Sequence, residues 1–169
     1  LWQTLVRDAE IRAHIDLAET QESYLVFTLV RHCRDSLLSD RIVSLELLDG
    51  FNVDGELREE RLRDVGDRCL LIAGLFPEQA RRRCVSNSYY ADLGRIAYAE
   101  LATWSRSTLS SLYAELAEMF RWLVNVLRAI RAETPLVLPH RIKPVASDQG
   151  PAMVMPESIS WTRGDQRVH

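Results

Sequence analysis

The chain has 169 residues, of which 47% are hydrophobic and 27% are charged, and its formal net charge is −3 at pH 7. A chain of this length buries about two thirds of the surface that its unfolded form exposes, so we expect one self-sufficient core. The near-neutral charge provides no basic field to attract nucleic acid, which disfavours a nucleic-acid-binding role.

Apolar residues recur at helical spacing up to about residue 133, and no sustained strand alternation interrupts them. The sequence therefore predicts an all-α fold, a single irregular bundle of about five or six helices over residues 1–133. Residues 134–169 differ in composition, because they hold five of the six prolines and cannot form a helix of any length. We expect them to form an extended Pro-rich tail.

The first two helices are expected over 3–17 and from Thr20 to about Arg34. Leu5, Ile11 and Ile15 are the candidates for the buried face of the first helix. The second helix is apolar around most of its circumference, which predicts a place in the centre of the bundle.

A short third helix precedes Gly50, which we expect to end it because glycine accepts the left-handed conformation that closes a helix. Its apolar residues are Ile42, Val43, Leu45, Leu47 and Leu48. Asp54 is the expected N-cap of a fourth helix that Pro77 ends or kinks. A fifth helix is predicted over 87–104 and a last one over 107–132.

Three glycines, Gly66, Gly74 and Gly94, lie inside predicted helices, where a glycine costs about 1 kcal/mol relative to alanine. They predict either close packing of two helices or a close approach of the backbone to a ligand. Both interpretations stay open from the sequence.

Arginines and tyrosines gather around the predicted helix break and the start of the fifth helix. Free N–H groups at a helix N-terminus, beside guanidinium groups, favour a phosphate or carboxylate ligand. The competing interpretation is a solvated run of charge. The candidate ligand-binding residues are Arg82, Arg83, Tyr89, Tyr90, Arg95 and Tyr98.

The tail carries apolar residues between its prolines, unlike most disordered segments. We expect it to pack on its own bundle or on a neighbouring subunit, and the second arrangement would make a homodimer. The candidate interface residues are Met153, Met155 and Trp161.

The four histidines and three cysteines show no metal-ligand spacing, so neither a metal nor a cofactor is expected. An odd number of cysteines without a CxxC spacing predicts a reducing, cytoplasmic environment. The longest apolar run, 69–76, is shorter than a bilayer span, so no membrane association is expected.

Part of the sequence resembles a pattern found in a group of uncharacterised bacterial all-helical proteins. The resemblance covers about a third of the chain and implies a bacterial, all-helical protein, without any activity, substrate or partner. The matching segments are Gly66-Asp67, Gly74-Leu75-Phe76-Pro77-Glu78, Arg82-Arg83, Tyr89-Tyr90, Gly94-Arg95 and Ala97-Tyr98.

No nucleophile, base and orienting partner stand at a spacing that catalysis requires. The leading hypothesis is therefore a non-enzymatic interaction or regulatory module that binds a protein partner or a second copy of itself. The alternative is a protein or enzyme that binds a small anionic ligand in region 81–98.

Overall fold

The computed structural model describes residues 1–32, 43–105 and 109–133. Within these ranges the chain forms eight α-helices and no strand, which confirms the predicted all-α class. All eight belong to one compact unit. The helices are α1 (Trp2–Ala13), α2 (Glu19–His32), α3 (Val43–Phe51), α4 (Gly55–Gly74), α5 (Pro77–Arg82), α6 (Asn87–Trp104), α7 (Ser110–Glu118) and α8 (Phe120–Glu133).

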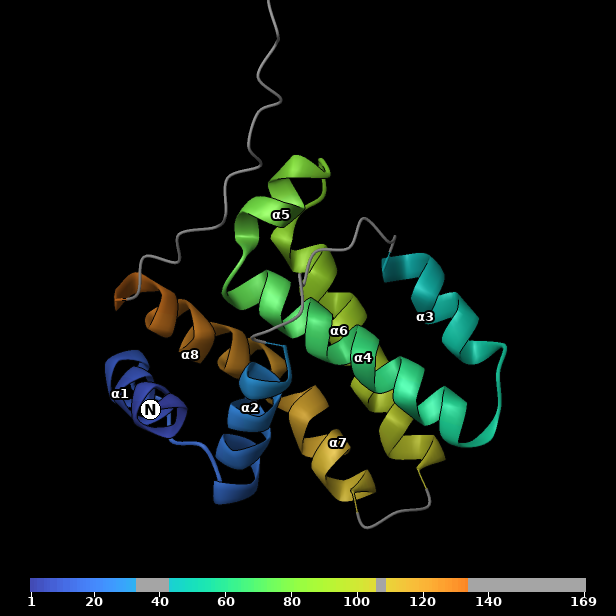
Figure 1. Ribbon diagram of the computed structural model, residues 1–169, viewed down its shortest axis with the longest axis horizontal. Helices are drawn as coiled ribbons and strands as arrows, with labels where there is room; N and C mark the ends of the chain where they lie inside the picture. The colour runs from blue at the N-terminus through green and yellow to red at the C-terminus, as the bar shows by residue number, and fades with distance from the viewer. Residues whose placement is uncertain (33–42, 106–108, 134–169) are drawn as a thin grey trace, which may run out of the picture. The chain divides into compact units, whose positions relative to one another are not determined.

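Helix α4 is the central element of the unit (Figure 1). It contacts α3, α5, α6 and α8, and every residue from Val65 to Gly74 is buried. The sequence instead predicted the second helix as the central one. That prediction is wrong, since α2 buries one face only and leaves Phe27 and Val30 about half exposed.

Two glycines allow α4 and α6 to approach each other closely. A Cβ atom at Gly66 would overlap the ring of Tyr98. A Cβ atom at Gly94 would overlap the ring of Phe120 and would lie 2.8 Å from Cβ of Cys69. At these two positions the glycines therefore make room for buried side chains, which is the helix-packing interpretation of the sequence.

Arg58 joins α3, α4 and α6 although it carries a charge and is almost fully buried. Its guanidinium lies 4.0 Å from the centre of the Trp104 ring and 5.8 Å from that of Phe51. One guanidinium N–H also donates to the carbonyl oxygen of Phe51, at 3.3 Å. The two aromatic rings, together with the carboxylate of Glu100 at 3.8 Å, compensate the charge and fix the ends of α3 and α6 beside α4.

Helix α1 is shorter than predicted, because His14 adopts the left-handed conformation (φ 54°) and ends the helix at Ala13. Its buried residues are Val6 and Ala9, whereas Ile11 is 73% exposed. The prediction that Ile11 faces the core is therefore wrong. An apolar residue at helical spacing is buried only if another helix covers that side.

The ends of the later helices follow the sequence more closely. Helix α6 has the predicted bounds, and Asp54 stands at the N-cap of α4. Gly50 does not stop α3, because it lies inside the helix, buried against Leu62. The predicted last helix is two helices, since Met119 leaves the helical conformation between α7 and α8.

The predicted tail lies outside the described residues, so its packing stays a prediction. Among the residues that the structure describes, no helix has the length and apolar character needed to cross a bilayer. The same residues include no cluster of three His, Cys, Asp or Glu side chains arranged to hold a metal ion.

We predict that Gly94→Ala destabilises the protein by about 1–2 kcal/mol, although alanine normally favours a helix by about 1 kcal/mol. The added methyl group overlaps the Phe120 ring, and its cost exceeds the gain in helix propensity. Urea denaturation followed by circular dichroism measures the difference.

The variant Phe120→Leu removes the ring that overlaps this methyl group, whereas the close contact with Cβ of Cys69 remains. In this background Gly94→Ala is expected to cost less than in the wild-type protein, but it should still destabilise. An equal cost in both backgrounds would show that overlap with the Phe120 ring is not the source of the cost.

Candidate functional site

The structure does not gather the sequence-predicted ligand residues around one hollow. Arg82 and Arg95 are exposed to solvent, whereas Tyr98 is fully buried. The rings of Tyr89 and Tyr90 pack edge to face, with centroids 5.7 Å apart. Arg83 is half-buried at the end of α5. An anionic-ligand site in region 81–98 stays a prediction, and Met153, Met155 and Trp161 lie outside the described residues.

A buried carboxylate is the main polar feature of the interior. Asp67, on α4, has no exposed surface. The hydroxyl groups of Tyr24 on α2 and Tyr98 on α6 both donate to its Oδ1 atom, each at 2.7 Å. Hydrogen bonds to a charged acceptor are short and strong, so this oxygen is well compensated for its loss of water.

Two basic side chains from the end of α2 face the other oxygen of Asp67. Nη1 of Arg31 lies 3.8 Å and Nε2 of His32 lies 3.6 Å from Oδ2. These distances are longer than hydrogen bonds, so their contribution is the attraction between charges in a region of low dielectric constant. His32 adds to it when it is protonated.

Three tyrosine rings surround the carboxylate. The Tyr113 ring of α7 stacks on that of Tyr98, with centroids 6.2 Å apart, and meets the Tyr24 ring edge to face. Burial, together with the charge of Asp67, raises the pKa of both Tyr24 and Tyr98 well above the ordinary value. Both hydroxyls therefore keep their protons and remain donors to Asp67.

We refer to Tyr24, Arg31, His32, Asp67 and Tyr98 as the Asp67 cluster. Its acceptor and one of its two donors have no exposed surface, so a substrate cannot reach them without opening the fold. The cluster ties together α2, α4 and α6, which are distant in sequence. It is best explained as a structural element.

An open hollow of about 520 Å³ lies beside this cluster. Its α4 residues follow three- and four-residue steps and so share one face of the helix. Arg31 of α2 and three residues of α3 form the other walls. We call this hollow the acidic groove, and it is lined by Arg31, Leu45, Glu46, Asp49, Leu57, Glu60, Arg61, Asp64 and Val65.

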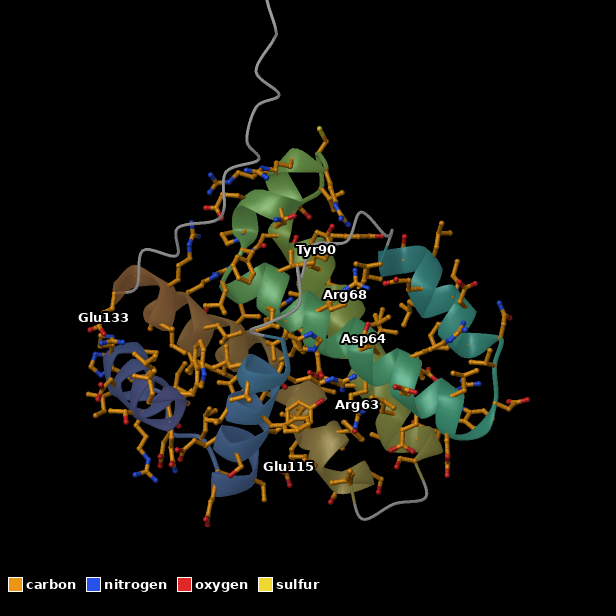
Figure 2. The ribbon with its side chains drawn as sticks, in the orientation of Figure 1. Arg63, Asp64, Arg68, Tyr90, Glu115 and Glu133 are labelled. Atoms are coloured by element: carbon orange, nitrogen blue, oxygen red, sulfur yellow. The ribbon has the colours of Figure 1, made fainter. Side chains whose placement is uncertain are left out.

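Within the groove, some charges are paired and others are not. Arg68 forms ion pairs with Glu46 and Asp64, and the second pair has a separation of 3.7 Å. Figure 2 shows Asp64 and Arg68 along α4. Asp49 and Glu60 are exposed, and neither forms an ion pair with another described residue.

Two leucine side chains that line the acidic groove are exposed to solvent. Leu45 on α3 is 53% exposed and Leu57 on α4 is 48% exposed. Single exposed leucines are ordinary on protein surfaces, but two from different helices at one hollow give a protein partner something to bury. The acidic groove therefore combines carboxylates with exposed leucine side chains.

Sequence reasoning missed both features. It singled out Tyr98, but as a ligand donor, and it counted Leu45 as an apolar residue of the third helix. Asp67 did leave a weak signal, because it lies with Arg68 between Val65 and the apolar run 69–76, and an aspartate at a buried position needs a partner. Nothing in the sequence identified Tyr24 as that partner.

A comparison of the chain with protein-family models, with curated proteins and with solved structures found no match.

We predict that Tyr98→Phe lowers the free energy of unfolding by about 1.5–3 kcal/mol, because Asp67 loses a charge-assisted hydrogen bond and stays buried. Urea denaturation measures the loss. Tyr90→Phe is the matched control: Tyr90 is buried on the same helix, but its hydroxyl does not bind Asp67, so a change below about 0.5 kcal/mol is expected. Equal losses from the two variants would disprove this role for Asp67.

We predict that the described cysteines differ in reactivity. Burial raises the pKa of the Cys69 thiol, whereas Cys84 is exposed. Because the thiolate is the reactive form, iodoacetamide should modify Cys84 in the folded protein and Cys69 only after unfolding in urea. Peptide mapping by mass spectrometry identifies the modified residue. Equally fast modification of both thiols in the native state would contradict the buried position of Cys69.

Proposed function

We propose that this protein is a non-enzymatic interaction module that binds a protein partner through the acidic groove. The observation that carries the proposal is the pair of exposed leucines, Leu45 and Leu57, at one hollow between helices. Each is about half exposed, so covering it with a partner would contribute about 1 kcal/mol. Apolar side chains of this kind, surrounded by polar residues, commonly anchor a protein interface.

The residue types in the groove also favour binding over catalysis. The described lining contains no Ser, Thr, Cys, Lys, His or Tyr side chain, so carboxylates are its only candidate acid–base groups. Two of them, Glu46 and Asp64, are paired with Arg68. The leucines and carboxylates that remain provide contact surface and charge.

We predict that the double variant Leu45→Ala/Leu57→Ala binds the cellular partner on the order of tenfold more weakly, because it removes both apolar contacts. Affinity purification from the source cells, with quantitative mass spectrometry, identifies proteins that the wild type retains. Loss of such a protein with the double variant supports the proposal.

Leu48→Ala is the control for this experiment. Leu48 is on α3 and 55% exposed, like Leu45, but it does not line the groove. Its substitution should leave partner binding unchanged. If Leu48→Ala lost the same partner as the double variant, or if the double variant retained every partner, the groove would not be the binding surface.

A further inference from the structure

The charges of the acidic groove restrict the chemistry of its partner. Four carboxylates and two guanidinium groups line it. Glu46 and Asp64 both pair with Arg68, and Asp64 also lies 4.0 Å from Arg31, whereas the exposed Asp49 and Glu60 lack an ion pair with any residue that the structure describes. A partner that brings lysine or arginine side chains to these two positions gains attraction, and an acidic partner is repelled.

The backbone of the groove restricts the partner's conformation. An extended peptide normally binds by adding a strand to a sheet edge, where main-chain N–H and C=O groups are free. The walls here are three helices, α2, α3 and α4, whose internal backbone groups are paired within each helix. They offer side chains only. A helix suits such a surface, because its own main-chain groups are already satisfied.

The dimensions of the groove agree with a helical partner. Its α4 face runs from Leu57 to Val65. At a rise of 1.5 Å per residue these residues span about 12 Å, the length of about two helical turns. A groove of this length accommodates aliphatic side chains three or four residues apart on one face of a partner helix.

A second copy of this chain is a poor occupant. In a symmetric dimer the same surface meets itself, so four carboxylates and two guanidinium groups would face an identical set, and the excess negative charge of each copy would repel that of the other.

We infer that the acidic groove binds a basic amphipathic helix of a protein partner. Its aliphatic face covers Leu45 and Leu57, and its lysines or arginines lie against Asp49 and Glu60. The inference rests on the proposed function and adds the partner's charge and conformation.

The test uses the full chain and labelled model peptides of about 14 residues, about four helical turns. The basic peptide carries leucines at three- and four-residue spacing on one face and lysines on its flanks. The acidic peptide has glutamate in place of every lysine. A third peptide repeats the basic sequence with a central proline, which breaks the helix. Fluorescence anisotropy measures binding of each peptide.

The basic peptide is expected to bind at least about tenfold more tightly than the acidic or the proline peptide, and more weakly as the salt concentration rises. Asp49→Asn combined with Glu60→Gln should weaken its binding about two- to fivefold, because each exposed ion pair contributes modestly. Asp92→Asn combined with Glu118→Gln removes the same charge from exposed positions outside the groove and should change little.

Three results would overturn the inference. The first is that the basic and acidic peptides bind equally tightly. The second is that the proline peptide binds as tightly as the basic peptide. The third is that the Asp49/Glu60 and Asp92/Glu118 double variants weaken binding of the basic peptide equally. If the basic peptide fails to bind while a cellular partner still depends on Leu45 and Leu57, the stated partner chemistry is wrong and the proposed function stands.

Discussion

The arrangement of the central helices depends on the burial of one carboxylate. Asp67 has no contact with water, so its charge must be compensated by donors that the fold brings to it. Those donors come from α2 and α6, through Tyr24 and Tyr98, and Arg31 adds a positive charge. Removing one hydrogen-bond donor of such a buried group typically costs about 1.5–3 kcal/mol, so this cluster favours one placement of the three helices.

Gly66, the residue before Asp67, makes the hydrogen bond from Tyr98 possible. Gly66 has no side chain, which lets the Tyr98 ring lie against α4, and the hydroxyl of that ring then reaches the carboxylate of the next residue. Arg31 links the Asp67 cluster to the acidic groove, because it faces Asp67 and also lies 4.0 Å from Asp64, which lines the groove. The interaction that holds α2 beside α4 therefore also positions one wall of the groove.

Helix α4 combines two environments along its length. Its second half is buried from Val65 to Gly74, whereas its first half presents Leu57 and Glu60 to solvent. The buried half fixes the position of the helix in the fold. The exposed half is therefore held in place as one wall of the groove. Acidic side chains around the exposed leucines interrupt the apolar surface of the groove and favour partners of opposite charge.

Local signals in the sequence determined the helical class, the bounds of α6 and the position of Asp54 before α4, because periodicity and residue preferences at helix ends act within a few residues. They did not determine which apolar residues are buried. Periodicity marks an apolar stripe, but Ile11, Phe27 and Leu45 stay exposed because no described helix covers them. Tyr24 and Asp67 are 43 residues apart, and only the tertiary fold brings them together. The acidic groove likewise exists only because three helices meet.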